Sequence, residues 1–263
     1  MIKIPRPAKI IICIASICIV AAVCYYFAVT PELKENMDNQ NNKNTNTNGG
    51  VEQHIDVVYY INLDKRTDRK TELLGELAKI NYPEDKIERI SAIYEKDRGH
   101  LGCSKSHIKT MQQFLASPHQ TCFVLEDDFE WAQSPETIIK QINTLFENNV
   151  DFDVCMLSVN PYDLIDTKEY PFLQKVNNGL TASGYIVNKK FVTTLLENFI
   201  EGAQKLEQSY IENDNKDYHG GYAIDQYWCN LQPQNKWYVF TPVLGKQRES
   251  FSDIQNGIVN YNV

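Results

Sequence analysis

The sharpest chemical feature of the sequence is three consecutive carboxylates, Glu126, Asp127 and Asp128, which directly follow an apolar run at residues 122–125. Carboxylates this close repel one another and raise each other's pKa values unless a cation or solvent compensates. A hard divalent ion prefers oxygen ligands and can bridge such carboxylates to phosphates. If the apolar run is a strand, these acids lie at the end where open α/β sheets bind ligands. The alternative interpretation is a solvated acidic turn.

A second feature is the stretch rich in glycine and serine at residues 99–107, which leads into apolar residues at helical spacing. Ser104 or Ser106 can cap that helix, and its free N–H groups and positive dipole end can then hold an anion, with Gly102 beside them. His107 follows one turn later and is a candidate base, although a histidine at such a position is more often a packing residue. The simpler explanation is that the stretch forms only a loop and a cap.

Two further segments carry groups that could contact a ligand. After the apolar run at residues 57–61, Asn62 could hold a base or ribose, while Arg66 and Arg69 could grip a pyrophosphate. Asp225 lies among aromatic residues at 222–228 that could stack on a sugar. The alternatives are a solvated first helical turn for the arginines and a buried aromatic cluster around Asp225.

The order of apolar patterns predicts the elements that must position these groups. Continuous apolar runs predict strands near residues 57–63, 90–94, 122–125, 154–159, 185–187 and 237–243. Helical spacing predicts helices near residues 73–80, 108–115, 138–146 and 191–199. This alternation predicts a layered α/β fold with a mainly parallel sheet, in which residues 51–263 form one domain.

Composition narrows the class of function. The chain has 263 residues, a net charge of −8 and 43% hydrophobic residues, which predicts a globular body. After residue 50, 21 basic and 31 acidic residues remain, a net charge of about −10. Neutralising a nucleic-acid backbone needs a surface rich in Lys and Arg, so we expect no nucleic-acid partner. Any phosphate that the body binds should need a metal ion.

The amino-terminal segment predicts a membrane anchor. Residues 10–29 carry no charge and are long enough to span the hydrocarbon core, and Lys3, Arg6 and Lys9 precede them. We therefore expect a cytoplasmic tail at residues 1–9, a signal anchor at residues 10–29 and a flexible Asn-rich stem at residues 30–50. The protein is then a single-pass type II membrane protein with its body on the lumenal, non-cytoplasmic side. The alternative, a cleavable signal peptide, normally has a shorter apolar region.

The body contains four cysteines, Cys103, Cys122, Cys155 and Cys229, with no CxxC spacing for zinc or redox chemistry. In an oxidising compartment they could pair in three ways. Cys122 and Cys155 fall inside apolar runs, where a free cysteine is an ordinary small core residue. We therefore expect free cysteines.

Five segments, in this order, resemble the family 25 glycosyltransferases, which include bacterial lipooligosaccharide galactosyltransferases and procollagen galactosyltransferases. The similarity extends from about residue 57 to residue 254. The matching pieces are Ile61-Asn62-Leu63 with Arg66 and Arg69, Gly102-Cys103-Ser104 with Ser106-His107, Leu125-Glu126-Asp127-Asp128, Ala182-Ser183-Gly184-Tyr185, and Ile224-Asp225.

The resemblance implies a GT-A fold, which is Rossmann-like, a UDP-hexose donor and Mn²⁺ or another divalent cation at the acidic motif. It implies that Asp128 is the best metal ligand, while Asp127 and Glu126 complete the metal site or hold the donor ribose. It also implies inversion at the anomeric carbon, which needs a general base on the acceptor hydroxyl. Asp225 is the first candidate for that base and His107 the second. The remaining residues expected to bind the donor are Asn62, Arg66, Arg69, Gly102, Ser104, Ser106, Gly184 and Tyr185.

The leading hypothesis is therefore a membrane-anchored, metal-dependent glycosyltransferase. It would move galactose or glucose from a UDP-sugar to a glycan or a collagen-like protein. The main alternative is a non-catalytic, membrane-tethered protein of the same fold that binds glycans or other partners. A metal-dependent hydrolase is the third possibility, and it would release sugar from the donor without an acceptor.

Overall fold

The computed structural model describes residues 49–213, 220–252 and 257–259. The predicted tail at residues 1–9, the predicted anchor at residues 10–29 and all but the last two residues of the predicted stem lie outside these ranges. Within them, no helix combines the length and the apolar character needed to cross a membrane.

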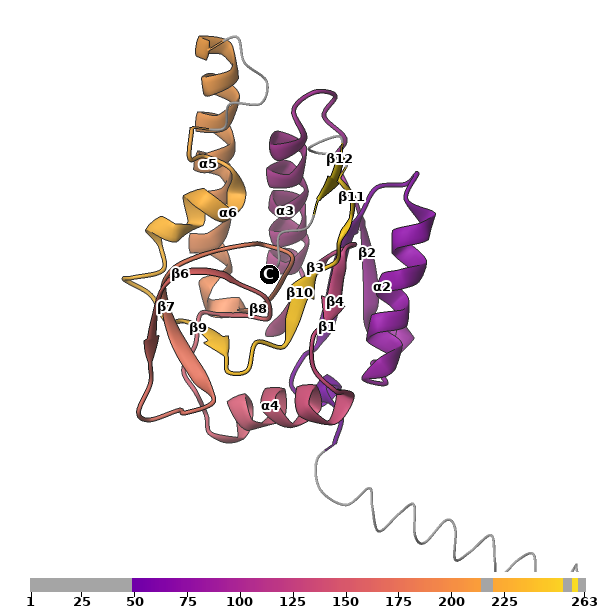
Figure 1. Cartoon of the computed structure of the whole chain (residues 1–263), viewed down its shortest axis with the longest axis vertical. Coiled ribbons are helices and arrows are strands. Elements are labelled where there is room, and N and C mark those ends of the chain that lie inside the picture. Colours follow the sequence, from indigo (N-terminus) through magenta and orange to yellow (C-terminus); the bar gives the residue numbers. More distant parts are fainter. Residues whose placement is uncertain (1–48, 214–219, 253–256, 260–263) are drawn as a thin grey trace, which may run out of the picture. The chain divides into compact units, whose positions relative to one another are not determined.

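Helices and strands alternate through the first half of the body, and strands dominate the second half (Figure 1). Short 3-10 turns occur at Val51–Gln53, Glu84–Lys86, Lys189–Phe191 and Trp228–Asn230. The helices are α2 (Thr67–Lys79), α3 (Gly99–Ala116), α4 (Pro135–Glu147), α5 (Val192–Asn213) and α6 (Ile224–Tyr227). The strands are β1 (Val57–Asn62), β2 (Ile87–Ser91), β3 (Thr121–Glu126), β4 (Phe129–Trp131), β5 (Val154–Met156), β6 (Asn160–Asp166), β7 (Leu173–Leu180), β8 (Gly184–Asn188), β9 (Trp237–Phe240), β10 (Gly245–Gln247), β11 (Ser250–Ser252) and β12 (Gly257–Val259).

The central sheet has eight strands in the order β2-β1-β3-β8-β5-β9-β7-β6. β1 is parallel to β2 and β3, and β5 is parallel to β9. β8 is antiparallel to both β3 and β5, and β7 is antiparallel to both β9 and β6. Six strands therefore point one way, and only β8 and β7 point the other way. The prediction of a layered α/β fold with mainly parallel strands is confirmed, whereas the antiparallel hairpin of β6 and β7 was not predicted.

The sheet is buried on both faces because successive side chains of a strand point to opposite sides. In β1, Val58 and Tyr60 belong to one apolar core, together with residues of α2 and α4. Val57 and Tyr59 belong to a second core, together with residues of α3 and α5. This double burial explains why β1 is a continuous apolar run in the sequence.

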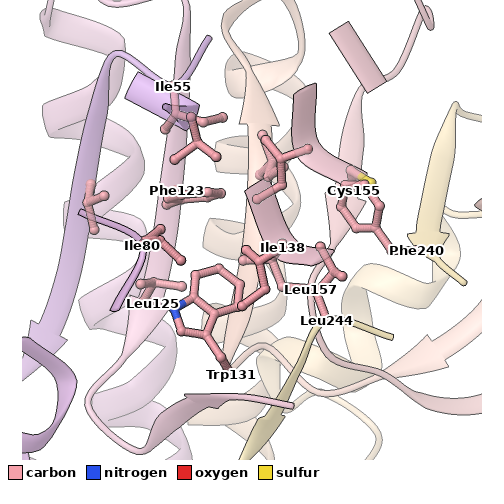
Figure 2. Packing of buried hydrophobic residues seen from close by; sticks show 14 of the residues in the cluster. Ile55, Ile80, Phe123, Leu125, Trp131, Ile138, Cys155, Leu157, Phe240 and Leu244 are labelled. Atoms are coloured by element: carbon pink, nitrogen blue, oxygen red, sulfur yellow. The ribbon is translucent and has the colours of Figure 1, made fainter. Parts of the chain in front are cut away.

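Each core is closed by helices whose apolar face meets the sheet. Figure 2 shows the first core, where Phe123 and Leu125 from β3 pack near Ile138 from α4 and Trp131 from β4. α4 begins at Pro135, three residues before the predicted range, because Ser134 caps it by accepting a hydrogen bond from the Thr137 N–H and Pro135 occupies the first turn. On the other face, α3 and α5 lie side by side (Figure 1). The helices thus hold the ends of β1, β2 and β3 in place.

The four body cysteines are free, as predicted. Cys122 in β3 and Cys155 in β5 are buried core residues, and Cys103 and Cys229 are half-buried.

Candidate functional site

A cleft opens at the carboxyl ends of the parallel strands β1, β2 and β3. These ends coincide because Ile61 pairs with Ile90 on one side and with Glu126 on the other. Open α/β sheets bind ligands at this edge. The space in the cleft that can hold the centre of a water molecule is about 120 Å³. The lining residues are Ile61, Leu63, Arg69, Ala92, Ile93, Tyr94, Glu95, Gly99, Cys103, Ser106, Glu126, Asp127, Asp128 and Gln247.

Asp127 is a buried carboxylate that is fully engaged with the protein. It accepts hydrogen bonds from Asn62 Nδ2 at 2.8 Å and from Arg69 Nη1 at 2.8 Å. Burial raises the pKa of Asp127, and the charge and hydrogen bond of Arg69 offset only part of that rise. Asn62 is itself buried and also accepts from Arg89 Nε at 3.0 Å. Asn62 therefore positions the acidic turn through its hydrogen bond to Asp127. It is not one of the residues that line the cleft.

Asp128 has one carboxylate oxygen that is satisfied and one that is not. Its Oδ2 accepts from Arg69 Nη1 at 3.2 Å and from Gln247 Nε2 at 3.1 Å. Its Oδ1 is buried and has no hydrogen-bond partner. Burial, reinforced by the charge of Glu126, raises the pKa of Asp128 to about 7. A buried, unpartnered carboxylate oxygen beside a cleft fits a ligand for a hard divalent cation.

Glu126 has different partners from its two acidic neighbours. Its Oε1 lies 2.9 Å from His107 Nε2 and 3.4 Å from Cys103 Sγ. Burial alone would raise the pKa of Glu126, but the hydrogen bond and charge of His107 outweigh it, so the pKa is lowered. His107 is fully buried, and its Nδ1 lies 2.8 Å from the Tyr185 hydroxyl. With both ring nitrogens engaged, His107 orients Glu126, and its predicted role as a base stays a prediction.

The two predicted arginines have different surroundings. Arg69, in the first turn of α2, is buried, lines the cleft and joins Asp127 to Asp128. Arg66 forms an ion pair with the exposed Asp68 at 2.9 Å and is not one of the lining residues. The structure therefore brings Arg69, but not Arg66, into the cleft wall.

The expectation that Ser104 or Ser106 caps a helix is wrong. α3 begins at Gly99, so both serines lie inside the helix, where their hydroxyls donate to the carbonyls of His100 and Gly102, four residues earlier. Ser106 also accepts from the Ile93 N–H at 2.8 Å and lines the cleft. A Cβ at Gly102 would lie 2.6 Å from the Ile93 carbonyl oxygen. The small residues of α3 therefore let the loop after β2 pack closely against the helix.

Gly184 and Tyr185, which the resemblance placed at the donor, lie in β8 and are buried. A Cβ at Gly184 would lie 2.5 Å from the Phe129 ring. Neither residue lines the cleft. Their observed contacts are structural, since Gly184 makes room for Phe129 and Tyr185 holds His107.

Asp225, the first candidate for a base, lies in the short helix α6 and is partly exposed. Its Oδ2 accepts from the Thr181 N–H at 3.2 Å. Burial is the main cause of the raised pKa of Cys103, and the charges of Glu126 and Asp225 add to it. Asp225 is thus close enough to act electrostatically on a cleft residue, although it does not itself line the cleft.

Sequence reasoning did not single out several residues of the cleft wall, among them Tyr94 and Gln247. Tyr94, which follows β2, is 59% exposed, and Lys65 Nζ lies 4.8 Å from its ring centroid. An aromatic residue just after a strand was the available signal for Tyr94. Gln247 reaches Asp128 because β10 pairs antiparallel with β4, directly after the acidic turn. Nothing in the local sequence indicates that pairing.

Comparison with protein-family models and with curated proteins gave no match. Solved structures with a related arrangement include A197 from STIV, with 11% identity, a TM-score of 0.41, and coverage of 78% of this chain and 94% of that one. A mannose-1-phosphate geranyltransferase from Thermus thermophilus has 8% identity, a TM-score of 0.39 and coverage of 70% and 72%. A glycosyltransferase involved in glycosylation of the major capsid of PBCV-1 has 10% identity, a TM-score of 0.32 and coverage of 70% and 92%. None of these similarities assigns the chain to a family.

Proposed function

We propose that this protein is a metal-dependent glycosyltransferase of the GT-A type that uses a UDP-hexose donor, with galactose or glucose as the sugar. The observation that carries the proposal is the buried and unpartnered Oδ1 of Asp128, in a cleft at the carboxyl ends of parallel strands. The resemblance of five sequence segments to the family 25 glycosyltransferases supports the same conclusion. The acceptor is a glycan or a collagen-like protein.

The charge of the cleft favours a cation between the protein and a diphosphate. Three carboxylates line the cleft at the acidic turn, and Arg69 is the basic residue among the described lining residues. Arg69 already pairs with Asp127 and Asp128, so a diphosphate alone would meet net negative charge. Asp128 Oδ1 would hold Mn²⁺ or another divalent ion, with Asp127 beside it. The bound ion would neutralise charge on the departing diphosphate.

The apolar residues of the cleft suit the nucleoside part of the donor. Leu63, Ile93 and Tyr94 line the cleft, and the Tyr94 ring is exposed. Aromatic rings stack on bases, whereas apolar side chains exclude water around them. The presence of both acidic and apolar lining residues matches a donor that carries a diphosphate and a base.

Asp225 is the proposed general base. In an inverting transfer, the acceptor oxygen attacks the anomeric carbon, the bond to the UDP oxygen breaks, and the acceptor proton passes to a carboxylate. Asp225 is partly exposed and held by the Thr181 N–H. His107 is the second candidate, and its role in the observed arrangement is to orient Glu126.

We also propose that residues 10–29 anchor the protein and place the body on the lumenal, non-cytoplasmic side. The support is the uncharged run itself, preceded by Lys3, Arg6 and Lys9.

Calorimetric titration of a panel of UDP-sugars, with Mn²⁺ and then with a chelator, tests the proposed function. We expect one UDP-hexose to bind only when Mn²⁺ is present, and Asp128→Asn to lose that binding. Asp151→Asn is the matched control, because Asp151 is an exposed partner of Lys190 and Lys236. Binding that survives in the chelator, or in Asp128→Asn, would refute the metal-dependent assignment. Sugar release without any acceptor would instead indicate a hydrolase.

A further inference from the structure

Glu126 shares a cluster with Cys103, which has no part in the proposed transfer of a sugar, and with His107, which is only the second candidate for its base. Its carboxylate, the Cys103 sulfur and a His107 ring nitrogen all lie within 4.8 Å of one another. Within this group, the carboxylate is 2.9 Å from His107 Nε2 and 3.4 Å from Cys103 Sγ. Cys103 and Glu126 line the cleft, and His107 lies buried beneath them.

The atoms of this cluster differ in kind from those at Asp128. A thiolate, an imidazole and a carboxylate are the ligand types of protein-bound Zn²⁺, whereas Mn²⁺ and Mg²⁺ prefer oxygen ligands. Ligand atoms of a tetrahedral zinc ion lie roughly 3.5 Å apart, as follows from bond lengths of about 2.0–2.3 Å. The separations from the carboxylate, 2.9 and 3.4 Å, lie close to that value, and the sulfur and the ring nitrogen are at most 4.8 Å apart. The thiolate and the carboxylate together carry two negative charges, which match a divalent cation.

The histidine is also held as a metal ligand should be. Its Nδ1 lies 2.8 Å from the Tyr185 hydroxyl, and Tyr185 is fully buried. Metal-bound histidines characteristically donate their second ring N–H to such a partner, which fixes the tautomer and the ring orientation. Phe199 packs edge-on against the same ring at 6.1 Å between centroids. When a metal ion replaces the proton that Nε2 shares with Glu126, the proton on Nδ1 can donate to the Tyr185 hydroxyl.

We propose that Cys103, His107 and Glu126 form a binding site for a thiophilic divalent cation of the Zn²⁺ class, with its fourth position open to the cleft. Binding displaces the thiol proton of Cys103 and the proton on His107 Nε2 to solvent, leaves the remaining imidazole proton on Nδ1, and changes no oxidation state. This site goes beyond the proposed transfer reaction, because it is separate from the hard cation expected at Asp128. The acidic triplet thus serves two sites, with Glu126 in one and Asp128 in the other.

Titration of the full chain with Co²⁺ as a spectroscopic probe tests this site without any measurement of transfer. Bound in this way, Co²⁺ gives a thiolate-to-cobalt charge-transfer band in the near ultraviolet together with the visible bands of tetrahedral cobalt. We expect one equivalent of these bands, bleached by Zn²⁺ but not by excess Mn²⁺. Cys103→Ser should lose the charge-transfer band. Cys229→Ser, the matched control at the other half-buried cysteine, should keep it.

Asp128→Asn separates this site from the proposed donor site. The variant should keep the cobalt bands even though it loses Mn²⁺-dependent binding of UDP-sugar. Three results would overturn the proposal: a folded wild-type protein with no thiolate band, a band that persists in Cys103→Ser, or a band that disappears in Asp128→Asn. Circular dichroism shows whether each variant is folded. Failure of the protein to bind any UDP-sugar would leave the cobalt result unaffected.

Discussion

Replacing Asp128 by asparagine should stabilise the metal-free fold, and the gain should grow as the pH rises. Burial and the charge of Glu126 raise the pKa of Asp128 from its ordinary value of 3.8 to about 7. Between these two values the folded state binds a proton that the unfolded state does not bind, so stability falls with rising pH. The contribution of the Asp128 carboxyl group to the stability of the fold is fully present below about pH 4 and is lost as the pH rises through about 7. Asparagine is neutral throughout and avoids this loss.

The size of the effect follows from the two pKa values. At about 1.36 kcal/mol per pKa unit, ionising this group in the fold costs roughly 2 kcal/mol at pH 5 and roughly 4 kcal/mol at pH 8. The free energy of unfolding of Asp128→Asn, relative to wild type, should therefore increase by about 2–3 kcal/mol between these pH values. Relaxation of the site and entry of water make this an upper value. A body of this size shifts its melting temperature by about 2–4 °C per kcal/mol.

Thermal unfolding of wild type and Asp128→Asn in chelator, at pH 5, 6, 7 and 8, measures this difference. Asp151→Asn is the control. Its stability relative to wild type should not increase as the pH rises, because hydrogen bonds from Lys190 and Lys236 lower the pKa of Asp151. Mn²⁺ should stabilise wild type at pH 8 but not Asp128→Asn. Below pH 7, the apparent Mn²⁺ affinity of wild type should fall about tenfold per pH unit, because metal and proton compete for one carboxylate. A stability difference that does not change with pH would refute the reasoning.

Three further predictions concern packing, the donor and the base. Gly184→Ala should destabilise the fold by about 1–3 kcal/mol in denaturant unfolding, because its Cβ would lie 2.5 Å from Phe129, whereas Gly75→Ala in α2 meets no atom within 4 Å and should be neutral or stabilising. Tyr94→Ala should weaken UDP-sugar binding about two- to tenfold by calorimetry, and the similarly exposed Tyr162→Ala should not; equal effects would argue against stacking. Asp225→Asn should lower turnover far more than donor affinity in steady-state kinetics, and a loss of donor affinity instead would assign Asp225 to the donor site.

Much of the fold could be predicted because its central strands are buried on both faces. β1 and β3 are continuous apolar runs in the sequence for that reason, and α4 shows its helical period and its Ser134 cap. The hairpin of β6 and β7 was missed because β6 is an edge strand with mostly exposed residues and no clear apolar pattern. The pairing of β4 with β10 was missed because each strand has only three residues and they lie far apart in the chain.

The candidate site also combines features that the sequence predicts with features that only the tertiary structure shows. The sequence by itself determined that three carboxylates follow an apolar strand, at the end where open α/β sheets bind ligands. Only the tertiary structure decided that the three acids differ: Glu126 meets Cys103 and His107, Asp127 meets Asn62 and Arg69, and Asp128 keeps one oxygen without a partner. The physical reason is that the pKa and the ligand chemistry of a carboxylate depend on burial and on charges within a few ångströms. Those neighbours come from α2, α3 and β10, at distances along the chain that no local pattern encodes.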